Sequence, residues 1–226
     1  MIIAKNIIKT FINGPVVTPV LKGIDVEIVD GEFVAIMGKS GAGKSTLMYQ
    51  LSLLDRPTEG DITVDGYDIL SMNDKERTNF RLQYLGYVFQ DYALLPEMTA
   101  IENVMIPTLM QGQSPRDARM AATKALERVG LGDRLSNRPS QLSGGEQQRV
   151  SIARAVAHNP VILFADEPTA NLDSVSGMEV LRLFEALRKE GQTIVMVTHE
   201  KEYTYACDRV IQLEDGLIES ITKKQK

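Results

Sequence analysis

Tryptophan is absent from this chain of 226 residues, and cysteine occurs once. The single cysteine, Cys207, excludes an intramolecular disulfide and offers no cysteine metal cluster, so we interpret it as a buried packing residue. No run of about 18 apolar residues occurs, and no membrane-spanning helix is predicted. Lys5 and Lys9 interrupt the apolar N-terminus before a signal-peptide core can form. We therefore expect a cytoplasmic protein.

An excess of basic residues is also missing. The 30 acidic and 25 basic side chains give a net charge of −5, a field that repels phosphate backbones, so nucleic acid is not an expected partner. Hydrophobic residues make up 43% of the chain and charged residues 24%, as in ordinary globular proteins. The length suits one α/β core with a small subdomain and is short for two ordinary domains.

Asp-Gly pairs at residues 30–31, 65–66 and 215–216 each predict a β-hairpin, because a type I′ turn needs positive φ at both central residues. The segments LKGIDVEIV, EFVAIMG and DITVDGYDI surround the first two pairs. They alternate or run apolar, and we expect them to form an N-terminal antiparallel β region beside a main sheet.

The pattern becomes helical after residue 100. Ser114 and Pro115 are a cap and first-turn pair, an apolar face follows at helical spacing, and Gly130 ends the helix. The apolar face consists of Ala118, Ala122, Ala125 and Val129. We expect residues from 90 to about 142 to form a helical subdomain, inserted into a single domain (1–226) whose core comprises residues 1–89 and 143–226.

A strand, a helix and a second strand follow one another in the C-terminal part. VILFAD precedes a helix with Val180, Phe184 and Leu187 on one face, Gly191 stops it, and TIVMVTH follows. This order predicts a βαβ crossover and therefore a parallel sheet.

The segment GKSGAGKS, residues 38–45, matches the phosphate-binding loop pattern G-x-x-x-x-G-K-[ST]. It follows an apolar strand and precedes a helix with Leu47, Leu51 and Leu54 on one face. The loop amides and the helix N-terminus favour phosphate. We expect Lys44 to reach the β and γ phosphates, and Ser45 can ligate Mg²⁺. The other residues expected to bind the nucleotide here are Gly38, Ser40, Gly41, Gly43 and Thr46. No guanine-reading N-K-x-D motif occurs, which favours ATP.

A second signal is LSGGEQQRV, residues 142–150. Ser143 and Glu146 form a capping box, and His158 suits the end of the same helix. Capping does not explain Gly144 and Gly145, each of which costs a helix up to about 1 kcal/mol relative to alanine. Bare backbone at a helix N-terminus favours an approaching phosphate.

With these motifs the sequence resembles the ABC ATPase family over nearly its whole length. The motifs are Phe11 at the A-loop position, GKSGAGKS, Gln90 in YVFQD, LSGGE, ILFADE, the D-loop ANLD at 170–173, and His199. Two positions depart from the common pattern: Glu146 replaces glutamine, and Phe11 replaces tyrosine, which keeps stacking on adenine but loses a hydroxyl contact.

The resemblance implies a P-loop NTPase core and a dimer in which ATP lies between the P-loop of one copy and Ser143, Gly144 and Gly145 of the other. Asp166 and Gln90 join Ser45 at Mg²⁺, and Asp173 lies across the interface. Glu167 is the expected general base, with Lys44 and His199 as further catalytic residues. Because adjacent side chains on a strand point to opposite faces, we expect Asp166 and Glu167 to have separate roles.

The stretch YVFQDYALLPEMTAIENVMIP resembles the MacB, LolD and FtsE ATPases, which work with FtsX-like membrane subunits. This implies an integral permease partner, and a position on the inner face of the membrane, for export, lipoprotein release or mechanical signalling. Residues 90–109 would then receive a coupling helix, although Ile101, Val104, Met105 and Leu109 fit an internal core equally well.

Two alternatives remain open at this point. One is a soluble ABC ATPase that moves no cargo. DNA-repair types carry long coiled-coil insertions and translation types carry two ATPase units, and neither fits a chain of 226 residues with one P-loop. An iron–sulfur assembly type does fit this length. The other is a module that senses ATP without hydrolysing it, against which Lys44, Asp166, Glu167 and His199 argue. The cargo is not encoded in this sequence.

Overall fold

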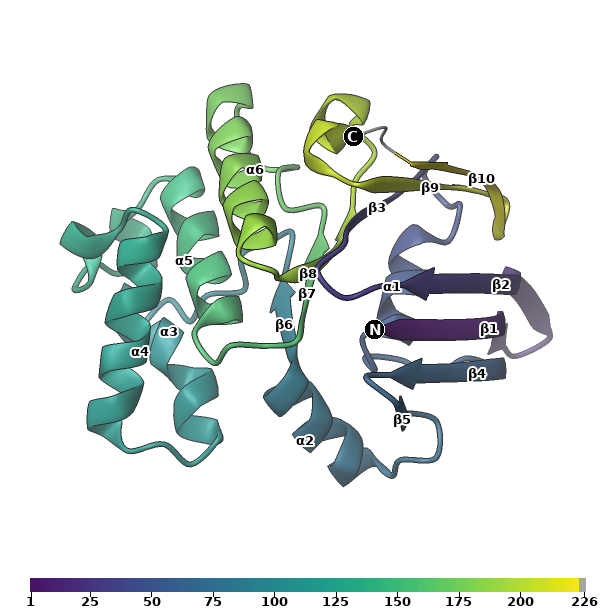
Figure 1. Ribbon diagram of the computed structural model, residues 1–226, viewed down its shortest axis with the longest axis horizontal. Helices are drawn as coiled ribbons and strands as arrows, with labels where there is room; N and C mark the ends of the chain where they lie inside the picture. The colour runs from purple at the N-terminus through teal and green to yellow at the C-terminus, as the bar shows by residue number, and fades with distance from the viewer. Residues whose placement is uncertain (224–226) are drawn as a thin grey trace.

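The computed structural model describes residues 1–223 and contains two β-sheets flanked by helices (Figure 1). The smaller sheet is antiparallel, with four strands in the order β2-β1-β4-β5. Its strands are β1 (Ile2–Asn13), β2 (Val16–Ile28), β4 (Glu59–Val64) and β5 (Tyr67–Asp68). The predicted antiparallel region is therefore present, and it lies at the N-terminal end of the chain.

The larger sheet has six strands in the order β10-β9-β3-β8-β7-β6. Five of them run parallel, and β10 pairs antiparallel with β9. The strands are β3 (Phe33–Gly38), β6 (Leu85–Val88), β7 (Ile162–Asp166), β8 (Thr193–Val197), β9 (Arg209–Glu214) and β10 (Leu217–Lys223). The predicted parallel pairing of the two C-terminal strands is confirmed by the register of β7 and β8.

The central strands of the larger sheet are buried on both faces. Along β3, Val34 and Ile36 face the smaller sheet and the first helix, whereas Phe33 and Ala35 face the helical side. The same alternation holds in β7 and β8. Continuous apolar runs such as FVAI and ILFA are what a parallel sheet with two covered faces requires.

The α-helices surround this sheet (Figure 1). They are α1 (Lys44–Leu51), α2 (Asp74–Tyr84), α3 (Ala100–Met110), α4 (Pro115–Arg128), α5 (Gly144–Val156) and α6 (Ser174–Lys189). Short 3₁₀ segments cover Gly132–Arg134, Pro139–Gln141 and Lys201–Ala206. Ser114 caps α4 as predicted, and α3, α4 and α5 pack together. Within residues 1–223, no helix is long and apolar enough to span a membrane.

Two of the three Asp-Gly pairs form hairpins. Both residues have positive φ at 65–66, between β4 and β5, and at 215–216, between β9 and β10. The hairpin predicted at 30–31 is wrong: only Gly31 has positive φ, and the turn carries the chain from β2 in one sheet to β3 in the other. EFVAIMG therefore belongs to the main sheet and not to the antiparallel region.

Two smaller predictions also need comment. Leu54 does not share the apolar face of α1, because the helix ends at Leu51, Leu53 adopts a φ of 61°, and Leu54 is exposed. His158 follows α5 as expected, but its ring is part-buried and its Nε2 lies 3.1 Å from the Leu85 carbonyl oxygen. Burial lowers the pKa of His158.

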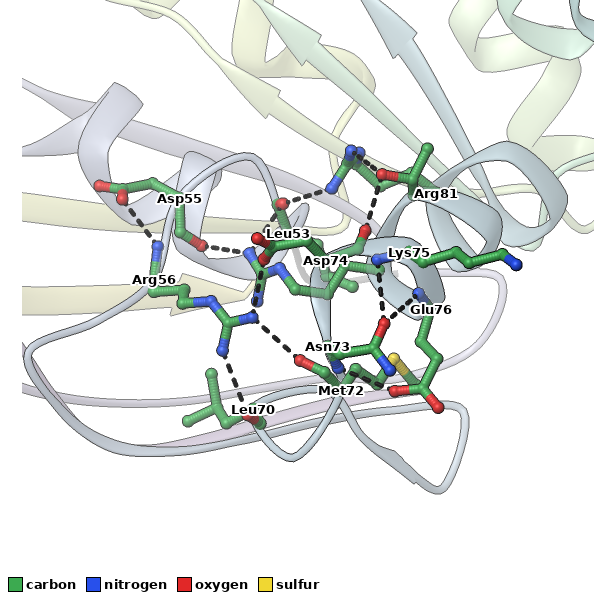
Figure 2. A network of polar contacts seen from close by, with 12 residues as sticks. Leu53, Asp55, Arg56, Leu70, Met72, Asn73, Asp74, Lys75, Glu76 and Arg81 are labelled. Atoms are coloured by element: carbon green, nitrogen blue, oxygen red, sulfur yellow. Dashed lines mark hydrogen bonds and ion pairs between the residues drawn. The ribbon is translucent and has the colours of Figure 1, made fainter.

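Arginines tie the loop after α1 to α2 (Figure 2). Arg77 is 4% exposed and donates to the carbonyl oxygens of Leu53 and Asp55, both at 2.8 Å. Arg81 also donates to the Leu53 oxygen, at 3.0 Å. These bonds satisfy two carbonyls of the loop, which lies outside any helix or strand.

Replacing Arg77 with alanine should lower the free energy of unfolding by about 2 kcal/mol, because it removes two charge-assisted hydrogen bonds from a buried position. Urea denaturation measures the change. The control is Asp74→Asn in the same network, which breaks an exposed Arg56–Asp74 ion pair and should change stability by less than about 0.5 kcal/mol. Equal effects of the two variants would contradict the structural role given to Arg77.

Candidate active site

Four neighbouring parallel strands deliver the predicted residues to one edge of the larger sheet. The P-loop follows β3, Asp166 ends β7, His199 follows β8 closely and Gln90 follows β6. The carboxyl ends of parallel strands are the usual ligand edge of such sheets. A hollow of about 520 Å³ lies here, lined by Met37, Gly38, Lys39, Ser40, Lys44, Glu167, His199 and Gln212.

The N-terminus of α1 has no side-chain cap among the described residues. The other five α-helices begin at residues whose side chains accept backbone N–H bonds: Asn73, Thr99, Ser114, Ser143 and Asp173. At α1 the cap position is Gly43, with φ of 96°, where a Cβ would lie 2.9 Å from Leu21 Cδ2. The amides at this helix start are therefore available to an anion.

Lys44 and Ser45 occupy the first turn of α1. Lys44 is 8% exposed, and its ammonium folds over the loop to donate to the Lys39 carbonyl oxygen at 3.1 Å. The Ser45 hydroxyl donates to Asp166 Oδ1 at 3.2 Å. Asp166, 121 residues along the chain from Ser45, is thus brought to the first turn of α1.

Asp166 is a buried carboxylate held by two hydroxyls. Tyr49, on α1, donates to Asp166 Oδ2 at 3.1 Å, opposite the Ser45 contact. Burial raises the pKa of Asp166, although both hydroxyls and the charge of Lys44 act in the other direction. The sequence contained no signal for Tyr49, because its contact depends on the packing of α1 against β7.

Glu167 lies beyond the end of β7 and adopts a φ of 44°. Its N–H donates to the Val197 oxygen at 3.0 Å, and its Oε2 lies 3.4 Å from Nδ1 of His199. We predicted that strand alternation turns the side chains of Asp166 and Glu167 to opposite faces. The structure differs: β7 ends at Asp166, and the left-handed backbone of Glu167 sets the direction of its side chain. Left-handed conformations of this kind cost about 1–3 kcal/mol in a non-glycine residue and gather at functional sites.

Gln90 is exposed in the turn that follows β6. Its own carbonyl oxygen accepts a hydrogen bond from Asn171 Nδ2 at 3.1 Å, so the turn touches the D-loop. Gln90 is not among the residues lining the hollow. The predicted Mg²⁺ role of Gln90 stays a prediction.

The segment LSGGEQQRV, residues 142–150, which we call the signature segment, lies outside the lining of this hollow. Ser143 and Glu146 form the predicted capping box, which lowers the pKa of Glu146 chiefly through the Ser143 N–H. A Cβ at Gly144 would lie 2.9 Å from the Tyr92 hydroxyl, and one at Gly145 would lie 3.0 Å from Ser176 Oγ. Both glycines therefore have a packing reason within the chain, in addition to the phosphate argument made from sequence. Neither they nor Ser143 line the hollow.

Asp173 and Phe11 have local roles that sequence patterns did not reveal. Asp173 caps α6, accepting from the N–H groups of Val175 and Ser176 and from the Ser176 hydroxyl. Phe11 is exposed on β1, with the Lys9 ammonium 4.9 Å from its ring centre.

Phe11 lies near the phosphate loop in the sheet register. It pairs with Thr18, two residues or about 7 Å along β2 from Val20. The Val20 carbonyl oxygen lies 3.2 Å from the Cβ position of Gly43. The strand that pairs with Phe11 therefore runs past the phosphate loop.

Comparisons with known proteins agree with this geometry. A family model described as ABC transporter matches residues 21–170. The chain belongs to the ABC transporter family. A solved dimeric ATP-binding cassette in a post-hydrolysis state, bound to ADP and Pi, matches it with a TM-score of 0.92 and 40% identity over 100% of both chains. The predicted family, ATPase class and cassette fold are confirmed.

Relatives carry several names. An uncharacterized ABC transporter ATP-binding protein of Methanocaldococcus jannaschii is 50% identical, and the match covers 99% of this chain and 100% of that protein. The lipoprotein-releasing system ATP-binding protein LolD of Aquifex aeolicus is 48% identical over 88% of this chain and 89% of its own. The macrolide export ATP-binding/permease protein MacB of Rhodopirellula baltica is 52% identical over 88% of this chain. The cassette spans only 30% of that MacB protein.

Asp166→Asn should raise the thermal unfolding midpoint of the nucleotide-free cassette at pH 7 in the presence of EDTA. The folded pKa of Asp166 is raised, so ionisation of the carboxylate opposes folding above the unfolded pKa of about 3.9, and asparagine never ionises.

The advantage of the Asp166→Asn variant should shrink as the pH falls through the raised folded pKa, and it is lost only below the unfolded pKa of about 3.9, where the carboxyl is neutral in the folded and the unfolded chain alike. Scanning calorimetry from pH 7 down to pH 4 follows it. A gain that is the same at every pH would contradict burial of the charge as its cause.

Proposed function

We propose that this cassette hydrolyses ATP in a dimer of two copies of the chain and thereby drives an integral membrane permease. The observation that carries the proposal is the separation of two groups of residues. Lys44, Glu167 and His199 line one hollow, beside the uncapped N-terminus of α1. The signature residues Ser143, Gly144 and Gly145 do not line it. A second copy is required to bring a signature helix to the nucleotide.

ATP is the expected substrate in the hollow. The first-turn amides of α1 and the ammonium of Lys44 would bind its phosphates. Phe11 would stack on the adenine, since every base offers a π-face. Gly38, Ser40, Gly41, Gly43 and Thr46 complete the binding residues that we assign.

The residues at the P-loop fit a magnesium ion. Ser45 Oγ and Asp166 Oδ1 converge to 3.2 Å, and hard oxygen donors with room for phosphate and water are what Mg²⁺ prefers. We assign Ser45, Asp166 and Gln90 to it. When bound, it would neutralise charge on the phosphates.

Glu167 is the proposed general base. Its carboxylate contacts His199 and borders the same hollow as Lys44, so it can accept a proton from a water held between His199 and the terminal phosphate. Lys44 and the amides of α1, together with Ser143, Gly144 and Gly145 of the second copy, supply positive potential where charge develops. We assign Asp173 to the interface with the second copy.

A permease is the proposed partner, and the cassette would lie on the cytoplasmic face of the membrane through it. The sequence left open whether the apolar residues of 101–109 form a docking groove or an internal core. Ile101 and Val104 of α3 are buried in the core. Leu109 is 40% exposed and Met110 is 64% exposed at the end of α3, next to α2, where Gln111 donates to the Leu82 oxygen. An exposed apolar end of a helix supports docking of an apolar partner element.

The type of permease follows from resemblance. The relatives named MacB and LolD support an FtsX-like partner in export or lipoprotein release. We retain residues 90 to about 142 as a helical subdomain within a single domain of residues 1–226, and residues 90–109 as the segment that receives the coupling helix. The helices α3 and α4 lie there, and α5 packs on both of them.

Glu167→Gln should reduce ATP turnover at least about a hundredfold, the size of a general-base contribution, while ATP binding persists. The variant should accumulate as a nucleotide-dependent dimer in sedimentation velocity. Glu127→Gln, an exposed acid on α4, is the matched control and should hydrolyse like the wild type. Turnover of Glu167→Gln within a few-fold of wild type would remove Glu167 as the base.

Ser143→Arg should abolish hydrolysis and leave the ATP affinity of the monomer within about twofold, because its side chain would meet the nucleotide of the other copy. Ser114→Arg is the control. Like Ser143→Arg, it removes a serine cap from a helix, here α4, and it should cost about 1 kcal/mol of stability. It should keep full turnover. A large loss of monomer affinity in Ser143→Arg would contradict the two-chain site.

A further inference from the structure

The turn formed by residues 90–93 is a strained piece of backbone at the edge of the active site. Tyr92 and Ala93 both adopt left-handed φ values, 58° and 50°, although neither is glycine. The Ala93 N–H donates to the Asp91 carbonyl oxygen at 2.5 Å, which closes the turn tightly. Conformations of this kind persist only where surrounding contacts hold them.

One set of contacts comes from the signature helix. Arg154, on α5, donates to the carbonyl oxygens of Tyr92 at 2.9 Å and Ala93 at 2.5 Å. Burial lowers the pKa of Arg154. The guanidinium therefore fixes the far half of the turn to the helix that begins at Gly144.

The second set comes from Asn171 in the D-loop, residues 170–173. Its Nδ2 donates to the Gln90 carbonyl oxygen at 3.1 Å and to Asp91 Oδ1 at 3.3 Å. Both partners are acceptors, so only the amide nitrogen can face them. The contact fixes the near half of the turn, including the backbone of Gln90 itself.

We propose that Asn171 is a positioning residue, whose side-chain amide sets the orientation of Gln90 from the D-loop of the same chain. The inference rests on the proposed function, in which Gln90 approaches Mg²⁺ and Asp173, two residues after Asn171, meets the second copy. A D-loop that shifts when the second copy binds then moves the Gln90 carbonyl with it. Occupancy of the dimer interface and the Mg²⁺ response of the same chain are coupled through this one side chain.

The isosteric substitution Asn171→Asp tests the donor directly. It keeps the size of the side chain and turns the N–H donor into a carboxylate oxygen that faces the Gln90 carbonyl and the Asp91 carboxylate. We expect the Mg²⁺ concentration that gives half-maximal ATPase to rise at least tenfold. Asn171→Ala, which removes both hydrogen bonds without adding repulsion, should raise it about fivefold, because only the bond to the Gln90 carbonyl acts on Gln90 directly.

Exchanging donor and acceptor provides a rescue. In the double variant Asn171→Asp with Asp91→Asn, the amide at position 91 can donate to the carboxylate at position 171, and the charge of the pair is unchanged. The half-maximal Mg²⁺ concentration should fall back to about the value of Asn171→Ala, because the bond to position 91 is restored with reversed direction while the Gln90 carbonyl still lacks its donor. Packing alone would make the single Asp variant silent and leave nothing to rescue.

Asn79→Asp, on the exposed face of α2, is the matched control for added charge and should leave the Mg²⁺ response unchanged. Each variant is also measured for ATP affinity in EDTA, which should match wild type, and for its unfolding midpoint, which should fall in Asn171→Asp and stay at the wild-type value in Asn79→Asp, because only the bonds of Asn171 hold the folded turn. A Mg²⁺ response of Asn171→Asp equal to that of wild type would overturn the positioning role while leaving the proposed hydrolysis intact. A wild-type chain without Mg²⁺-dependent turnover would overturn both.

Discussion

A parallel sheet covered on both faces is the constraint on which the site depends. Val34 and Ile36 point to one apolar layer while Phe33 and Ala35 point to the other, so a one-residue shift of β3 would exchange the two sets and mispack both layers. The same holds for β7 and β8. With these strands fixed, the P-loop, Asp166, Glu167 and His199 all emerge at one edge, and the chemistry follows from where the strands end.

The residues at that edge are not arranged for stability. The burial of Asp166 opposes its ionisation, Glu167 holds a left-handed backbone, and α1 begins without a side-chain cap although the other α-helices have one. Each of these features costs free energy in the empty chain. Each also prepares a contact for a phosphate, a cation or a water, so their concentration at one place is itself an argument for function.

Local chemistry made much of this predictable. The P-loop, the capping box at Ser143 and the two true Asp-Gly hairpins are each contained in fewer than ten consecutive residues, and all three appear in the structure. The turn at residues 30–31 carries the same dipeptide but joins two sheets, because a turn signal does not specify which strand is the partner. Contacts of Tyr49 with Asp166, 117 residues away, and of Asn171 with Gln90, 81 residues away, depend on packing that no local pattern contains. The conformation of Glu167 was missed for a related reason, since the strand was assumed to continue through it.

The central claim is that a complete site needs two chains, and mixing two inactive variants tests it most directly. A chain with Glu167→Gln keeps its signature, and a chain with Ser143→Arg keeps its P-loop and base. In a mixed dimer one of the two sites is therefore complete. ATP turnover measured after mixing the two proteins, before ATP is added, should rise well above the sum of their separate rates. No recovery over the whole range of mixing ratios, with mixed dimers demonstrated by copurification through a tag on one of the two variants, would contradict a site shared between two copies.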